Sequence, residues 1–148
     1  MDRSLVVPLA VTLMTATGCG LLMGEAGFSR ISSEGFDPIG PTSTYVGVVA
    51  LRDNGCIFLD SDDASRWVVW PPGAKYESTD QHDSNIRLSD GTKVESGDHV
   101  RITGELLTIS DLPQGANQDS MWGAHSRFCF QGTDGEPEIL RAESVIFK

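Results

Sequence analysis

Residues 45–59 have the sequence YVGVVALRDNGCIFL, two apolar runs on either side of a polar turn. The first run is rich in β-branched residues, and Gly47 in its middle predicts a bulge or a bend. The tripeptide Asp53-Asn54-Gly55 is a strong signal for a tight hairpin turn. This stretch therefore predicts two antiparallel strands joined by a short loop.

Further short strands are expected downstream, each bounded by turn residues. The most apolar run of the chain is Arg66 to Trp70, and Pro71-Pro72-Gly73 ends it. The runs Asn85 to Leu88 and Thr92 to Val94 flank the turn Ser89-Asp90-Gly91, so they predict a second hairpin.

Two later segments alternate with a period of two residues. In the first, the residues expected to face inward are Val100, Ile102, Gly104 and Leu106, and those expected to face water are His99, Arg101, Thr103 and Glu105. In the last, Leu140, Ala142, Ser144 and Ile146 alternate with Arg141 and Glu143. No helical periodicity appears from Thr44 onward, so we expect an all-β sandwich or barrel.

The order of these pieces resembles a small OB-like barrel of five to seven strands. The likeness lies in a glycine-containing first strand that turns into a second, and in a later strand that opens with Gly97-Asp98. More narrowly, GCI at 55–57, VVWPPG at 68–73, GDxV at 97–100 and a late cysteine resemble small, uncharacterised envelope lipoproteins of bacteria. This resemblance implies a location and a fold and carries no activity with it.

Residues 1–18 have the features of an export signal, with Arg3 near the start and an apolar stretch from Leu5 to Met14. The next residues, Ala16-Thr17-Gly18-Cys19, resemble the lipobox of bacterial lipoproteins. The resemblance implies cleavage before Cys19 and acylation of that cysteine, and two or more acyl chains would anchor the protein durably in a lipid bilayer.

The alternative is an uncleaved membrane helix from Leu5 to Met23, which is just long enough to span a bilayer. Both interpretations leave the rest of the chain outside the inner membrane. Residues 19–43 are rich in glycine, serine and threonine and predict a lipidated N-terminus followed by a flexible linker. The β domain is then expected at 44–148.

Composition limits the partners. The chain has 148 residues, 39% of them hydrophobic, and a formal net charge of -10, which indicates one domain with a modest core. An acidic molecule repels phosphate backbones, so nucleic acid is not an expected partner.

The cysteines predict a covalent link. If Cys19 is lipidated, Cys56 and Cys129 remain as an even pair in an oxidising compartment, which favours a disulfide between them. The rival roles, a thiol nucleophile or a metal ligand, lack a Cys-x-x-Cys motif.

Two groups of residues are candidates for binding. Trp67 and Trp70 are three apart, so on a strand they face opposite sides, one filling the core and the other under a loop or exposed. An exposed ring beside Pro71 and Pro72 would offer an aromatic surface for a peptide, a glycan or a protein. The acidic residues Asp60, Asp62 and Asp63 form a solvated turn or, as a weaker alternative, a site for a divalent cation.

No hydrolase signature, cofactor motif or zinc-ligand spacing is present in the sequence. We therefore expect a non-enzymatic binding or structural module of the cell envelope, without a cofactor. Its partner would be an envelope protein or a wall component. The alternative is a protein that binds a small ligand or a divalent cation at Asp60 to Asp63.

Overall fold

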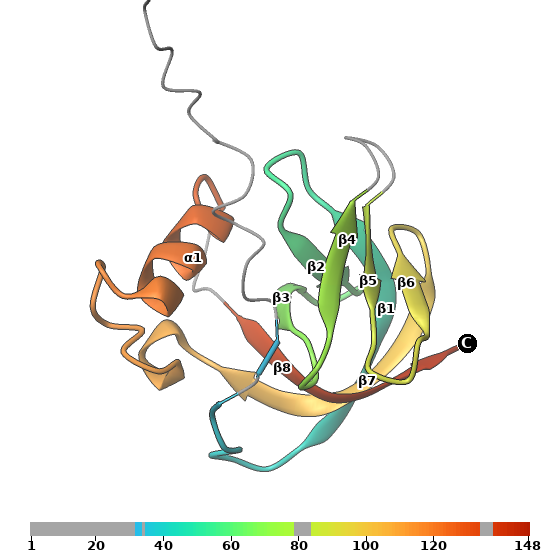
Figure 1. Cartoon of the computed structure of the whole chain (residues 1–148), viewed down its shortest axis with the longest axis horizontal. Coiled ribbons are helices and arrows are strands. Elements are labelled where there is room, and N and C mark those ends of the chain that lie inside the picture. The colour runs from blue at the N-terminus through green and yellow to red at the C-terminus, as the bar shows by residue number, and fades with distance from the viewer. Residues whose placement is uncertain (1–31, 34, 79–83, 134–137) are drawn as a thin grey trace, which may run out of the picture.

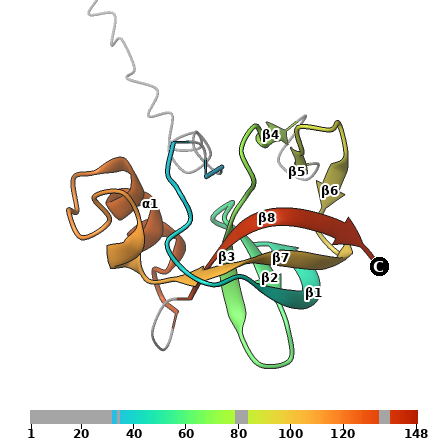
Figure 2. The same ribbon diagram turned by 90° about the horizontal axis from the view of Figure 1, so that it is seen from below.

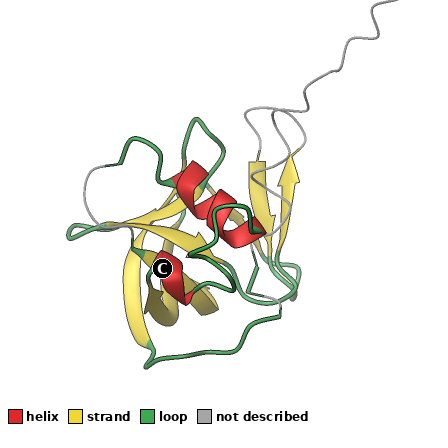
Figure 3. Ribbon diagram, turned by 90° about the vertical axis from the view of Figure 1, so that its left-hand side faces the viewer, coloured by secondary structure: helices red, strands yellow, loops and turns green. Residues whose placement is uncertain are grey.

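The computed structural model of the chain describes residues 32–33, 35–78, 84–133 and 138–148. Within these ranges the chain is mostly β, with eight strands, a short 3-10 helix at Ile109–Asp111 and one α-helix, α1, at Met121–Cys129 (Figure 3). None of the helices in these ranges has the length and apolar character needed to cross a membrane. The predicted signal 1–18 and Cys19 lie outside the described residues.

Five strands form one mixed sheet (Figure 1). They are β1 (Ser43–Leu51), β2 (Ile57–Asp60), β3 (Ser65–Val69), β7 (His99–Leu107) and β8 (Ile139–Phe147). The pairing order is β1-β2-β3-β8-β7, and because β1 also pairs with β7, the pairing returns to its start. The pair β3 and β8 is parallel, whereas the other neighbours are antiparallel.

The remaining strands form a second, antiparallel sheet in the order β4-β5-β6. They are β4 (Lys75–Ser78), β5 (Ser84–Arg87) and β6 (Lys93–Glu95). Figure 1 and Figure 2 show this sheet and α1 at different sides of the five-stranded sheet. The strands β5 and β6 match the predicted second hairpin, but β4 was not expected from the sequence.

The residues of β3 and the bridge residue that follows it contribute to two separate buried clusters. Val68 and Trp70 belong to the cluster inside the closed sheet, which also contains Ile86 and Val94 of the second sheet. Trp67 and Val69 belong to the cluster between the sheet and α1. Since successive side chains of a strand point to opposite faces, the run from Trp67 to Trp70 is apolar throughout because it is buried on both faces.

The bulge predicted as one alternative at Gly47 is absent, because Gly47 and its neighbours keep one continuous register with β7. Its role is close approach instead. A Cβ at this position would lie 2.3 Å from the backbone oxygen of Asp60, which no side chain can tolerate. The glycine therefore allows β1 to pass from pairing with β7 to pairing with β2.

The predicted alternation along the last strand is wrong beyond Ala142. The register of β7 and β8 shifts between Thr103, which pairs with Ser144, and Gly104, which pairs with Ala142. The extra residue reverses the faces, so that Val145 packs on the inner cluster and Ile146 is 58% exposed. Leu106, also expected inside, is 43% exposed.

The helix α1 was not predicted. Its N-cap is Ser120, whose side chain accepts a hydrogen bond from the backbone N–H of Gly123 at 3.0 Å. The buried residues of α1 are Trp122, Gly123, His125, Ser126 and Cys129. This face is small and polar for the most part, so it produces no apolar stripe in the sequence.

Part of the predicted linker 19–43 packs against the domain. The backbone N–H of Ser33 donates to the carbonyl of Trp70 at 2.7 Å, and Ser33 is buried. The segment 36–40, here named the N-terminal strap, covers the buried pair of Glu105 and Arg141. Glu105 was expected to face water, and it is buried because the strap and Arg141 satisfy its carboxylate.

Candidate binding cavity

A cavity of about 760 Å³ lies between three segments that are distant in sequence. The turn between β1 and β2 contributes Arg52, Asp53 and Asn54, and the turn between β2 and β3 contributes Asp63, followed by Ser65 at the start of β3. The third wall comes from the end of α1 and the chain that follows it, with Cys129, Phe130, Gln131, Thr133 and Glu138. The size is that of a small-ligand site, and the walls come from loops, where binding residues concentrate.

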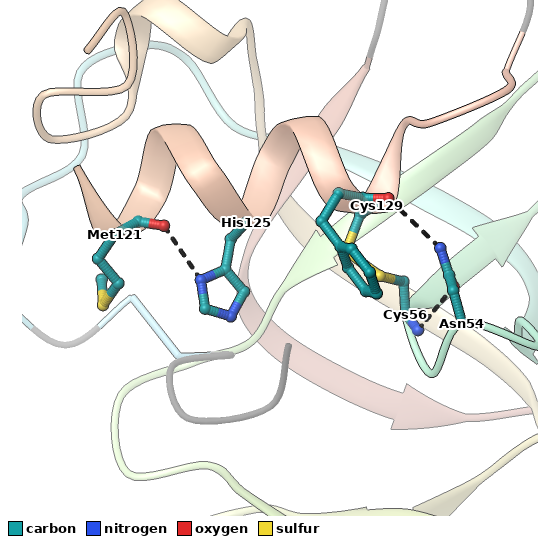
Figure 4. Close-up of a disulfide and its surroundings, with 6 residues drawn as sticks. Asn54, Cys56, Met121, His125 and Cys129 are labelled. Carbon is teal, nitrogen blue, oxygen red and sulfur yellow. Dashed lines mark hydrogen bonds between the residues drawn. A yellow bond between two sulfur atoms is a disulfide. The ribbon is translucent and has the colours of Figure 1, made fainter. Parts of the chain in front are cut away.

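A disulfide joins two of these segments. Cys56 and Cys129 are bonded, as the sequence predicted, with a Cα–Cα separation of 5.6 Å (Figure 4). The bond closes a loop of 73 residues, which destabilises the unfolded chain by roughly 4 kcal/mol on the chain-entropy model. The first and third walls of the cavity are therefore held together covalently.

Asn54 fixes the turn beside the disulfide. Its Oδ1 accepts a hydrogen bond from the backbone N–H of Cys56 at 3.1 Å, and its Nδ2 donates to the carbonyl of Phe128 at 3.5 Å (Figure 4). Gly55 takes the left-handed conformation that this turn requires, with φ of 84°. The hairpin turn predicted from Asp53-Asn54-Gly55 is confirmed, and the same asparagine links it to the end of α1.

The guanidinium of Arg52 is a positively charged group in the lining of the cavity. Its Nη2 donates to Asp60 Oδ1 at 2.7 Å and to Ser65 Oγ at 2.9 Å. The guanidinium also lies over the ring of Phe58, 5.2 Å from its centroid. No described residue accepts a hydrogen bond from its Nε or Nη1, so these donors remain available to a ligand.

Two carboxylates of the cavity share Arg66. Its side chain is only 6% exposed, and its nitrogens lie 2.8 Å from Asp63 Oδ2 and 2.8 Å from Glu138 Oε2. The hydrogen bonds from Arg66 hold the pKa of Asp63 well below its usual range, and Asp63 in turn raises the pKa of Arg66. Asp63 is thus held as a charged hydrogen-bond acceptor, and the same guanidinium fixes the position of the Glu138 side chain.

Aromatic rings form the apolar side of the cavity. Phe130 is half-buried and meets Phe58 edge to face, with ring centroids 5.8 Å apart. It makes a second such contact with Trp67 at 6.2 Å. These contacts restrain both phenyl rings, so the cavity combines a rigid apolar side with polar groups.

Of the two alternatives for the tryptophans of the β3 segment, the exposed aromatic surface is wrong and the covered position is confirmed. Trp67 and Trp70 do point to opposite faces, as predicted, but their exposed fractions are 3% and 0%. The strap and α1 cover the side on which Trp67 lies, where Trp122 packs on it. Pro71 is half-buried and Pro72 is exposed, so without a tryptophan they offer little to a partner.

The acidic turn does not gather a cation site. Asp60 accepts hydrogen bonds from Arg52 and Ser65, and Asp63 is paired with Arg66. Asp62 is exposed, and no group of three metal-ligating side chains occurs among the described residues. Arg52 and Arg66 already bind the carboxylates that a divalent cation would need as ligands.

Most cavity residues were not among the candidates chosen from the sequence. Arg52 and Gln131 belong to no motif, whereas Asn54, Asp63 and Cys129 were singled out for a turn, an acidic site and a disulfide, and not for this cavity. One signal could have found them. A disulfide between Cys56 and Cys129 brings the residues adjacent to each cysteine together, so the turn before Cys56 and the chain after Cys129 had to lie side by side.

Comparisons with protein families, with curated proteins and with solved structures find no match to this chain.

Proposed function

We propose that this protein is an exported, lipid-anchored binding module of the bacterial cell envelope that works without catalysis. The observation that carries the proposal is the polar cavity between the two loops joined by Cys56 and Cys129. Pockets of this size, with a few convergent polar groups on an apolar side, are the usual form of a small-ligand site. A wall component or an exposed segment of an envelope protein would be the occupant.

The proposed fold is an OB-like barrel. Its support is the closed pairing of five strands, in which the last strand, β8, lies between β3 and β7. OB barrels bind ligands at the face of their second and third strands and at the loops after the first and fourth strands. Two of the three walls of the cavity come from the corresponding connections, the loop after β1 and the end of the connection between β7 and β8, which favours the binding role by analogy of fold.

The Asp63 carboxylate of the cavity is poorly suited to act as a general acid in hydrolysis. A general acid needs a pKa near the working pH, so that it holds a proton and can release it. The pKa of Asp63 is lowered by the hydrogen bonds from Arg66, so this carboxylate is suited to accept hydrogen bonds from a ligand and not to supply a proton.

Location follows from the lipobox-like residues Ala16-Thr17-Gly18-Cys19. Acylation of Cys19 would hold the domain at a membrane surface, outside the cytoplasm, where the oxidising conditions favour the disulfide. A module tethered in this way meets envelope components at high local concentration, so modest affinity suffices for function.

The experiment is affinity capture from detergent-solubilised envelopes, comparing the unaltered chain with cavity variants. Asp53→Ala and Gln131→Ala remove exposed side chains of the lining, and Asp62→Ala and Gln118→Ala remove matched exposed side chains elsewhere. We expect the cavity variants to lose the captured component and the controls to retain it. Equal capture by all four variants would contradict a binding role for the cavity.

A further inference from the structure

We propose that the cavity binds a neutral saccharide, an inference that rests on the binding function proposed above. The occupant is a sugar unit of a glycan whose hydroxyl groups both donate and accept hydrogen bonds. The hydrogen-bonding groups of the lining, the ion pairs that already engage its arginines and its apolar side each favour this class.

The lining offers both donors and acceptors. Arg52 has only donors, the carboxylates of Asp53, Asp63 and Glu138 have only acceptors, and Gln131 carries an amide with both. Neighbouring hydroxyls of a sugar need a donor for each oxygen and an acceptor for each proton. A phosphate would use the donors alone, and an ammonium group would use the acceptors alone.

Both arginines at the site are paired with carboxylates of the protein, and the site keeps a net negative charge because Arg66 serves two carboxylates and no ion pair joins Asp53 to a described residue. Arg52 lies 2.7 Å from Asp60, and Arg66 is shared by Asp63 and Glu138. Charged groups that are already paired keep further lone pairs and N–H groups for hydrogen bonds, but they gain little from another ion. A neutral ligand that hydrogen-bonds to charged groups receives the stronger, charge-assisted bonds without competing for a partner.

Phe130 supplies the apolar surface that a sugar ring needs. It is half-buried at the cavity wall, and Phe58 and Trp67 hold its ring in place by edge-to-face contacts. A pyranose has one face composed of C–H groups, which packs on an aromatic ring while its hydroxyls reach outward. The volume of about 760 Å³ accommodates more than one such ring.

The test is a titration of the whole chain, purified in a detergent without a sugar headgroup, with chitotetraose and with maltotetraose. Backbone amide signals are followed by NMR, with inorganic phosphate and lysine as the charged comparison probes. We expect one of the saccharides to shift the signals of residues 52–54 and 129–133. Asp53→Ala or Gln131→Ala should raise its Kd about tenfold, the cost of a lost charge-assisted or neutral hydrogen bond. Asp62→Ala and Gln118→Ala should leave the Kd within about twofold of the unaltered value.

The two proposals fail in different ways. The saccharide inference is overturned if neither saccharide shifts these signals at about 10 mM, well above the Kd of a millimolar site. It is also overturned if phosphate or lysine shifts them instead. Should capture from envelopes still depend on Asp53 and Gln131, the binding function stands with another ligand class. If capture is independent of both residues, the binding function falls as well.

Discussion

Arg66 shows how a single charged residue is accommodated in the wall of the sheet. Its neighbours Trp67 and Val68 are buried apolar residues, and its own side chain is nearly inaccessible. A buried guanidinium is costly unless its N–H groups and its charge are satisfied. Asp63 and Glu138 do this from the edge of the cavity, and the ring of Tyr45 lies 5.1 Å from the guanidinium carbon.

The pairing of Asp63 with Arg66 predicts a specific dependence of stability on pH. Because the pKa of Asp63 in the folded protein lies below its ordinary value of 3.8, the ionised form favours folding. This contribution is complete above about pH 5 and is lost as the pH falls through 3.8 toward the folded-state pKa. Asp63→Asn should therefore lower the free energy of unfolding near neutral pH, and its difference from the unaltered protein should shrink in acid.

The measurement is urea unfolding between about pH 7 and pH 2. Asp62→Asn is the matched control, since Asp62 is the exposed neighbour and no ion pair joins it to any described residue. A difference for Asp63→Asn that stays constant down to the lowest pH would show that the ion pair does not contribute in this way.

Among the structural elements, the N-terminal strap has the clearest energetic role. Glu105 is 1% exposed and accepts hydrogen bonds from the backbone N–H groups of Ile39 at 3.0 Å and Gly40 at 2.7 Å. Arg141 lies 3.3 Å from Glu105 and stacks over Phe36, with 5.2 Å from the guanidinium carbon to the ring centroid. The strap thus supplies the hydrogen-bond donors and the aromatic ring that a buried pair of charges needs in place of water.

Glu105→Gln should destabilise the protein by about 3 kcal/mol, because it leaves Arg141 buried without its charge partner. The control is Glu143→Gln, which removes an exposed carboxylate 3.6 Å from the same guanidinium and should cost less than about 1 kcal/mol. Chemical unfolding gives both values. Amide exchange at Ile39 and Gly40 should also become faster in Glu105→Gln alone. Equal destabilisation by the two variants would contradict the role assigned to the strap.

The strands could be predicted where one rule dominates. Turn residues located both hairpins, and the apolar run before Pro71 located β3. These sequence rules failed where the structure depends on how one element packs against another. The bulge opposite Thr103 reverses the faces of β8, and nothing in the sequence marks its position. The helix α1 depends on its contact with the loop before it. A Cβ at Gly123 would lie 2.0 Å from the backbone oxygen of Asn117, so this position must be glycine, a residue that by itself disfavours a helix.

At the scale of the whole molecule, the disulfide could be predicted and the cavity could not. Parity of the cysteines and the expected compartment were enough for Cys56 and Cys129. The cavity needs the positions of three loops at once, and its residues are ordinary polar side chains of turns. Glu105 and Arg141 show the same limit, since their burial depends on a segment whose composition is that of a linker.

The anchor gives the last prediction. If Cys19 is acylated, only about 13 residues separate it from Ser32, which already contacts the domain, so the attachment point lies at most ~45 Å from that residue. Cys19→Ala should abolish labelling by a fatty acid and leave a precursor that keeps its first 18 residues. The domain should still fold, because the disulfide between Cys56 and Cys129 does not depend on Cys19.

Three measurements test these outcomes: fatty-acid labelling, the mass of the isolated chain and its distribution between membrane and soluble fractions. Ser29→Ala, outside the lipobox-like residues, serves as the control and should be labelled normally. A Cys19→Ala chain that is labelled and processed like the control would show that the anchor is elsewhere or absent.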